Sequence, residues 1–295
     1  MIGKFGKRNH KDEKDRYYTD PIFAKKFVEM VDERYGLKNF SLCIEPSAGN
    51  GSFSQFLPIA NRVCYDIEPK AEGIIKRDYF EVSYEPDNIL VIGNPPFGRV
   101  SSTAIKFFNH SAEFAEVIAF IIPQTFHRIN IQNKLDFNFG MVYSYDIDEC
   151  IFTPKLNAKC SFQIWQKKEE RREKIVLKSY HEDWIFLPLG SKDGNNQPTS
   201  PKNPSFAIGA YGVRAGKIIT AGFDKLRPKS WHWIKTDDPD KLIERFSKLD
   251  YSIAEKTVRQ SSLGKGELVK LYEDYYQESN HLGTLQKFFK NSLDK

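Results

Sequence analysis

The sequence lacks the features that mark several large classes of protein. Its 295 residues contain no run of about 18 apolar residues, so we expect no transmembrane helix. The first sixteen residues are charged and have no apolar signal core, so we expect no secretory signal. Only four cysteines are present, none in a Cys-x-x-Cys pair, and the six histidines show no metal-binding spacing. A metal site is therefore not predicted, and the cysteine usage favours a reduced, cytoplasmic setting.

The residues that are present suit a folded chain with an uneven charge. With 40% hydrophobic residues, the chain is long enough for one large α/β domain and a smaller appendage. The net charge of +5 is concentrated late in the sequence, where residues 192–235 hold eight basic and only two acidic side chains. This excess favours a surface that faces phosphates, with a solvated loop region as the alternative interpretation.

The apolar pattern predicts strands that alternate with helices, which is typical of a parallel sheet with crossover helices. Strands are predicted at 40–45, 62–68, 89–94 and 116–123, and helices at 20–36 and 102–115, with a glycine turn that runs into a further helix after residue 47. Two more strands, at 141–149 and 161–168, are expected to close the sheet at one edge.

A charged run at 167–174 and a change in composition predict a domain boundary near residue 169. We therefore expect a mobile basic arm at 1–16, an α/β domain at 17–168 and a small α+β region at 169–295. In the last region, short strands are predicted within 185–189, 205–213 and 217–223, and helices at 237–249 and 267–278.

A series of glycines, acids and aromatics follows the predicted strands. In "IEPSAGNGSF" (44–53) a strand ends in Glu45, and Gly49 and Gly51 then allow the backbone to approach a ligand closely. Asp66 ends the next strand, where a carboxylate can accept hydrogen bonds from two ribose hydroxyls. Asp78 follows with two aromatic neighbours, a pattern that suits an adenine ring, although an ordinary helix cap is the alternative. The series indicates a nucleoside-binding site.

The stretch "VIGNPPFG" (91–98) ends a buried strand with Asn-Pro-Pro-Phe. Together with "EPSAGNG" (45–51), it resembles the S-adenosylmethionine-dependent N6-adenine DNA methyltransferases. The order of these motifs, with "RYYTDP" (16–21) ahead of them, is similar to the gamma class of that family. The resemblance covers about residues 16–168.

The resemblance implies a Rossmann-like class I methyltransferase sheet with a smaller C-terminal target-recognition region. It implies S-adenosyl-L-methionine as cofactor, S-adenosyl-L-homocysteine as product and no metal, in a bacterial or viral setting. Thr19, with Tyr18 nearby, matches the position that contacts the methionine carboxylate. The full set of expected cofactor-binding residues is Thr19, Glu45, Pro46, Ala48, Gly49, Gly51, Asp66, Ile67, Asp78, Tyr79, Phe80 and Asn94.

The chemistry of an aromatic amine explains the Asn-Pro-Pro-Phe motif. The nitrogen is a poor nucleophile because its lone pair is conjugated with the ring. Two fixed acceptors, the amide oxygen of Asn94 and the carbonyl of Pro95, would draw the nitrogen towards tetrahedral geometry. Pro95 and Pro96 restrict the backbone there. Phe97 offers a face for stacking an extruded base.

Further aromatic and basic residues are candidates for substrate binding. Phe152 is our first candidate, ahead of Phe162, for a second aromatic ring that would stack on the other side of the extruded base. Pro123 is a candidate for shaping the entrance of the same pocket. For these three residues core packing is the alternative role. The remaining candidates lie in the basic segment: Arg214 and Lys217 for phosphates, and Trp231 and Trp233 for either bases or the core.

Several substrates remain open at this point. Double-stranded DNA is the leading prediction, acted on by a monomer. The motif with Gly98 after it resembles the motif of enzymes that methylate adenine in structured RNA, so RNA is the alternative substrate. Methylation of a protein glutamine at N5 is less favoured, because an amide would not need the Phe97 face. A nucleic-acid-binding module without enzymatic activity would bind no cofactor.

Overall fold

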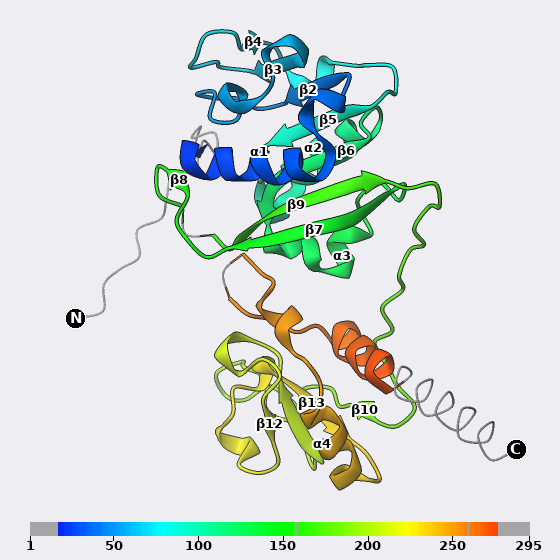
Figure 1. The fold of residues 1–295 in the computed structure, drawn as a ribbon. Helices are drawn as coiled ribbons and strands as arrows, with labels where there is room; N and C mark the ends of the chain where they lie inside the picture. Colours follow the sequence, from blue (N-terminus) through cyan, green and yellow to red (C-terminus); the bar gives the residue numbers. More distant parts are fainter. Residues whose placement is uncertain (1–16, 157, 259, 277–295) are drawn as a thin grey trace, which may run out of the picture. The chain divides into compact units, whose positions relative to one another are not determined.

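The computed structural model describes residues 17–156, 158–258 and 260–276, so the arm predicted at 1–16 lies outside the described residues. The chain divides into two compact units, residues 1–174 and 175–295, each with a sheet of its own (Figure 1). Each unit also has its own hydrophobic core. The division falls at the end of the charged run 167–174. No helix in the described part of the chain has the length and apolar character needed to span a bilayer.

The first unit is built on a seven-stranded sheet with the order β4-β3-β2-β5-β6-β9-β7. Its strands are β2 (Leu42–Glu45), β3 (Arg62–Asp66), β4 (Ile75–Lys76), β5 (Ile89–Gly93), β6 (Val117–Pro123), β7 (Phe139–Ile147) and β9 (Cys160–Lys167). The first five strands in this order are parallel, and β9 is antiparallel to both of its neighbours. This order confirms the predicted α/β Rossmann-like sheet of the class I methyltransferase type.

Two details of the prediction were wrong. The sheet is mixed and not parallel throughout, because β9 runs antiparallel to both β6 and β7. The glycine turn after β2 leads into the short 3-10 turns η2 (Ser54–Phe56) and η3 (Ile59–Asn61), and not into an α-helix. Pro58 explains this difference, since its ring and missing N–H prevent a helix from continuing through it.

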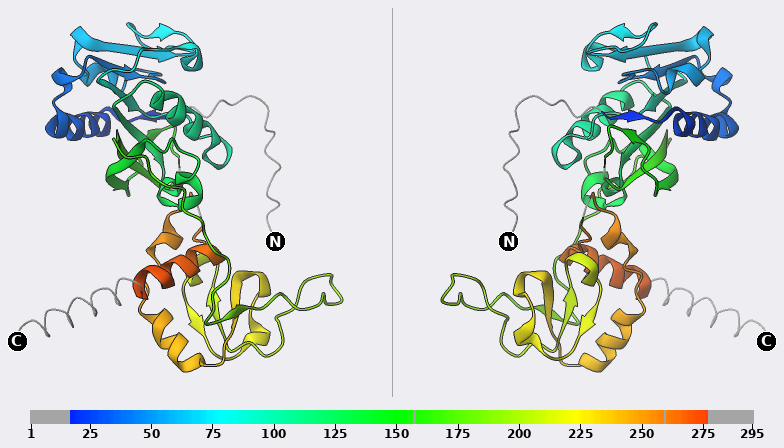
Figure 2. Two further views of the ribbon diagram at one scale, coloured as in Figure 1. Left: turned by 90° about the vertical axis from the view of Figure 1, so that its right-hand side faces the viewer. Right: turned by 90° about the vertical axis from the view of Figure 1, so that its left-hand side faces the viewer.

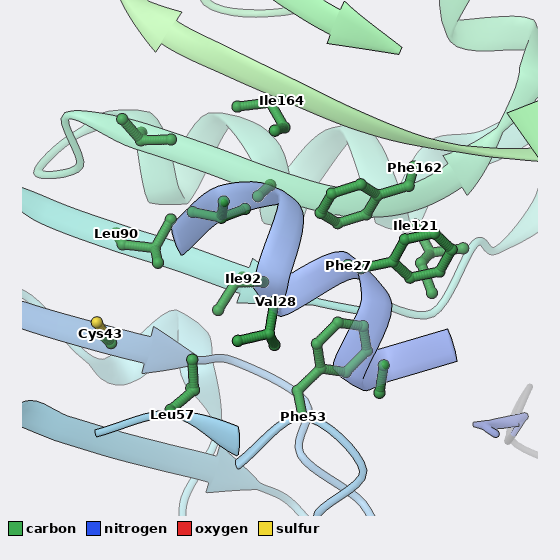
Figure 3. Close-up of a cluster of buried hydrophobic side chains, with 14 of the residues drawn as sticks. Phe27, Val28, Cys43, Phe53, Leu57, Leu90, Ile92, Ile121, Phe162 and Ile164 are labelled. Atoms are coloured by element: carbon green, nitrogen blue, oxygen red, sulfur yellow. The ribbon is translucent and has the colours of Figure 1, made fainter. Parts of the chain in front are cut away.

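Helices α1 (Pro21–Tyr35) and α2 (Ser102–Ala112) cover opposite faces of this sheet (Figure 2). Side chains alternate along a strand, so Ile92 and Val91 belong to different cores. On one face, Phe27 and Val28 of α1 pack with residues such as Ile92 (Figure 3). The start of α1 is as predicted, with Asp20 as N-cap accepting a hydrogen bond from the N–H of Ile22 at 2.8 Å.

Shorter elements complete the first unit. Strands β1 (Tyr18–Thr19) and β8 (Phe152–Thr153) form a separate antiparallel pair. The others are α3 (Ile129–Gln132) and the 3-10 turns η1 (Leu37–Asn39), η4 (Tyr79–Glu81), η5 (Arg99–Ser101) and η6 (Gln124–His127).

The second unit has a four-stranded antiparallel sheet with the order β10-β13-β11-β12. Its strands are β10 (Ile185–Phe186), β11 (Phe206–Gly209), β12 (Ile218–Ile219) and β13 (Trp231–Lys235), and its turns are η7 (Gly212–Arg214), η8 (Phe223–Lys225), η9 (Pro228–Ser230) and η10 (Ser252–Glu255). Helix α4 (Pro239–Ser247) and the helical residues 265–276 pack on one face of the sheet. The last two residues of the helix predicted at 267–278 lie outside the described residues.

The strand β13 was not predicted, and it decides the role of two tryptophans. Trp231 and Trp233 are both buried, and they pack on the face of the sheet that α4 does not cover. The indole N–H of Trp233 donates to the carbonyl of Pro228 at 3.0 Å. Of the two roles left open for these residues, the structure shows the core role, so neither is available to stack on a base.

Candidate active site

A cavity of about 340 Å³ opens where the carboxyl ends of β2, β3 and β5 meet. In an open α/β sheet this is where ligands bind, because the strand order reverses there. Eleven of the twelve predicted cofactor residues line the cavity: Thr19, Glu45, Pro46, Ala48, Gly49, Asp66, Ile67, Asp78, Tyr79, Phe80 and Asn94. The sequence motifs therefore meet in one place.

The glycine turn and the acid at the end of β3 are tied together. The N–H of Gly49 donates to Oδ2 of Asp66 at 2.8 Å, and the N–H of Glu68 donates to Oδ1 at 2.7 Å. Gly49 has a φ of +52°, and a Cβ atom there would lie 2.8 Å from the Tyr18 ring. Gly51 is the predicted cofactor residue that does not line the cavity, and its N–H closes the turn on the Ala48 carbonyl at 2.7 Å.

Two buried polar atoms in the cavity wall lack a protein partner. Burial raises the pKa of the Glu45 carboxyl to about 8, although the backbone N–H groups of Ser54 and Phe53 act in the opposite direction. Oε2 of Glu45 and Oγ1 of Thr19 are both buried without a hydrogen bond. Buried polar groups are nearly always satisfied, so these two atoms are the candidates in the cavity wall for binding a polar ligand.

The residues that follow β4 form another part of the wall. Asp78 is exposed and caps η4, accepting from the N–H of Phe80 at 3.0 Å. The Phe80 ring is 42% exposed and meets Phe107 edge-on at 4.9 Å, so an apolar face remains available. Tyr79 is buried, and its hydroxyl shares a hydrogen bond with Oγ of Ser111 at 2.9 Å. Tyr79 thus supports the wall, while Asp78 contributes a carboxylate to the cavity and Phe80 contributes an aromatic face.

Asn94 follows β5 with its side chain held from one side. Its Nδ2 donates to the backbone carbonyl of Tyr17 at 2.9 Å, and the backbone carbonyl of Asn94 accepts from Oγ of Ser47 at 3.1 Å. No described residue donates to its Oδ1. Pro95 is buried beside it, and Pro96 lines the cavity. The amide oxygen is therefore the part of Asn94 that remains for a ligand.

The predicted aromatic residues have different surroundings. Phe97 is half-buried outside the cavity wall, and its ring lies edge-on to Phe152 at 6.4 Å. Phe152 is 7% exposed and also lies 6.5 Å from the Tyr17 ring. Phe162 is fully buried and stacks on Phe27 at 4.5 Å. Phe162 is thus a core residue, and Phe152 is the one that lies beside the Asn-Pro-Pro-Phe motif.

The structure changes the list of residues expected around the cavity. Pro123 is buried at the end of β6 and does not line the cavity. The wall residues that sequence reasoning missed are Tyr17, Ser47, Asn50, Ser52, Phe53, Glu68, Arg77, Thr103 and Phe107. Most of them lie next to a recognised motif, which was the available signal. Thr103 and Phe107 belong to α2, and no local pattern indicated that α2 reaches the cavity.

The remaining candidates lie in the second unit. Arg214, which ends η7, and Lys217, which precedes β12, are both exposed. Within residues 17–156, 158–258 and 260–276, no group of three His, Cys, Asp or Glu side chains is arranged to hold a metal ion.

Comparison with known proteins gives matches in structure but not in sequence. No family model matches the chain, and no curated protein sequence matches it. A proposed RNA methyltransferase from Pyrococcus horikoshii is 16% identical, with a TM-score of 0.42 over 55% of this chain and 91% of that one. The 23S rRNA methyltransferase ErmE is 14% identical, with a TM-score of 0.39 over 53% of this chain and 71% of its own.

A chain of a type I R-M system is 13% identical and has a TM-score of 0.40 over 94% of this chain and 66% of its own. These identities are too low to carry an activity from one protein to another. The class I methyltransferase fold of this chain rests on its own strand order, in which β9 lies antiparallel between β6 and β7.

Proposed function

We propose that this protein transfers a methyl group from S-adenosyl-L-methionine to the N6 amino group of adenine in DNA. One observation carries the proposal. Asn94 lies in the wall of the cavity that the nucleoside-binding series forms, with its amide nitrogen held by the Tyr17 carbonyl and its amide oxygen left for another donor. An amino group that approaches this oxygen would stand next to the proposed cofactor site.

The polar groups of the cavity suit the cofactor. The buried Oγ1 of Thr19 can donate to a carboxylate, and Oε2 of Glu45 can accept from an ammonium group. Asp66 keeps lone pairs for ribose hydroxyls, and Phe80 has an exposed face for an adenine ring. Bound there, S-adenosyl-L-methionine would supply a methyl group already activated by its sulfonium.

The residues after β5 would prepare the target nitrogen. Oδ1 of Asn94 and the carbonyl of Pro95 would accept hydrogen bonds from its two N–H groups, which draws the lone pair out of conjugation. After the methyl group leaves the sulfonium for the nitrogen, the nitrogen would release one proton to solvent. Because the Tyr17 and Ser47 contacts hold Asn94, the acceptor needs little reorganisation as positive charge develops on the nitrogen. Phe97 would stack on the extruded base, with Phe152 packed edge-on behind it.

The charge of the second unit supports a nucleic-acid partner. All eight basic side chains of residues 192–235 are exposed, and none forms an ion pair with another residue that the structure describes. By contrast, Lys248 of α4 pairs with Glu244 at 2.7 Å, and Lys270 pairs with Asp274 at 2.9 Å. Unpaired cations such as Arg214 and Lys217 would contact phosphates.

Gly98 does not favour RNA over DNA. It has a φ of +68°, and a Cβ atom there would collide with Oγ1 of Thr103. The backbone therefore requires glycine whichever polymer is bound.

The proposal is tested with matched pools of duplex DNA and RNA and with tritiated S-adenosyl-L-methionine. We expect label at N6 of adenine in DNA, and a loss of at least about 100-fold in Asn94→Ala. Calorimetry should show that Asn94→Ala still binds the cofactor. Label in RNA alone would move the substrate to RNA, and label in neither pool by a protein that binds the cofactor would exclude nucleic acid as the substrate. Absence of cofactor binding by the wild type would exclude a methyltransferase.

A further inference from the structure

The loop that follows the Asn-Pro-Pro-Phe motif holds a β-branched residue in an unfavourable backbone conformation. Val100 has φ 53° and ψ 39°, the left-handed region that β-branched side chains avoid. Ser101 next to it has a φ of 61°. Such conformations persist only where the surrounding structure imposes them, and they concentrate at functional sites.

Contacts at both ends impose this conformation. The carbonyl of Phe97 accepts from the N–H groups of Thr103 and Ala104 at 3.2 and 3.3 Å. Ser101 is buried, and its hydroxyl shares a hydrogen bond with Oγ1 of Thr125 at 3.0 Å. The loop is thus anchored to the start of α2 and to η6.

The tip presents an aliphatic side chain to solvent. Val100 is 72% exposed, and Arg99 beside it is exposed as well. Pro96 and Thr103, on either side of the loop in sequence, both line the cavity. Both ends of the loop therefore lie at the cavity wall. Asn or Gly would adopt the same backbone at lower cost, so folding alone does not explain a valine here.

We propose that Val100 is a positioning residue that enters the DNA duplex when the target adenine leaves it. This inference rests on the proposed function. A base that moves into the active site leaves an unstacked gap, and the apolar side chains that DNA-bending proteins insert between base steps show that a duplex accepts such a residue. A valine on this anchored loop would occupy the gap with little loss of side-chain freedom, since valine has few rotamers. Arg99 would contact a flanking phosphate.

The inference is tested with Val100→Gly and Val100→Asn, which both accept the left-handed backbone. Methylation is compared on a duplex with a paired target adenine and on the same duplex with an abasic site opposite that adenine. We expect kcat/KM on the paired substrate to fall about tenfold or more, because extrusion is the step that loses its support, and to change less than about twofold on the unpaired one. The fluorescence gain of 2-aminopurine at the target position should shrink in parallel.

Three controls separate this role from a structural one. Val100→Ile should retain both activities, because it keeps a β-branched apolar side chain. Ile59→Ala should behave as wild type. Ile59 is 83% exposed like Val100, but it precedes the amino end of β3, whereas the cavity lies at the carboxyl ends of the strands. The melting temperatures of Val100→Gly and Val100→Asn should equal or exceed that of the wild type, because the strain is relieved.

An equal loss on both substrates, or no loss on either, would overturn the inference while leaving the proposed function intact. A wild-type protein that methylates no adenine in DNA would overturn both.

Discussion

Nδ2 of Asn94 donates a hydrogen bond to the backbone carbonyl of Tyr17 at 2.9 Å, across 77 positions of sequence. Tyr17 immediately precedes β1, which pairs with β8 and packs the Tyr18 ring close to Gly49. One short segment therefore contacts both the glycine turn and the side chain proposed to activate the target amine.

This contact predicts the effect of Asn94→Asp. The aspartate keeps an acceptor oxygen but cannot donate to the Tyr17 carbonyl, and its charge would face that carbonyl. We expect single-turnover methylation to fall about 10- to 100-fold, by the loss of one positioned hydrogen bond, and to fall further in Asn94→Ala. Calorimetry should show that both variants still bind S-adenosyl-L-methionine, so the loss of rate is not a loss of the cofactor. Full activity in Asn94→Asp would show that the Tyr17 contact does not position the side chain.

The unpartnered hydroxyl of Thr19 predicts opposite effects on stability and binding. Thr19→Val removes a buried hydroxyl that has no hydrogen bond, so the ligand-free protein should gain up to about 1 kcal/mol of stability. The same change should weaken cofactor binding about fivefold, by loss of one hydrogen bond. Thermal unfolding with and without S-adenosyl-L-methionine measures both quantities. Thr19→Ser, which keeps the hydroxyl, should bind normally; weakened binding there would assign the effect to the methyl group.

The Glu45 carboxyl predicts how stability depends on pH. Its pKa is about 8 in the folded chain against 4.5 for the free side chain, so the folded state holds the proton more tightly. Stability from this group is fully present below pH 4.5 and declines as pH rises towards 8, by at most about 1.4 kcal/mol per pH unit. Denaturant titrations of wild type and Glu45→Gln between pH 5 and 8 should diverge accordingly. Parallel curves would show that Glu45 ionises normally.

The unpaired cations of the second unit predict a change in the salt dependence of binding. Replacing Arg214 and Lys217 together with Gln should lower the slope of log K against log salt concentration by about 2, if both contact phosphates. Lys248→Gln serves as the control, because Lys248 is already paired with Glu244. Fluorescence anisotropy with a labelled duplex at several salt concentrations measures the slope. An unchanged slope in the double variant would remove these two residues from the interface.

Local patterns were sufficient to predict most of the first unit. Asp20 and Pro21 marked the start of α1, and apolar runs marked β2, β3, β5 and β6, because capping and burial act over a few residues. Prediction failed where distant contacts override local preference. β13 was missed because its tryptophans and neighbouring basic residues resemble a surface, although the sheet buries Trp231 and Trp233.

The sequence by itself determined the residues at the carboxyl edge of the sheet: a glycine turn, acids that end two strands, and Asn-Pro-Pro-Phe after a third. These residues have to meet because parallel neighbouring strands end at the same edge. Only the tertiary structure decided that the Tyr17 carbonyl holds Asn94, that Phe152 and not Phe162 lies beside Phe97, and that Val100 is strained and exposed on the loop before α2. Those relationships depend on how distant segments pack, which no local pattern of residues encodes.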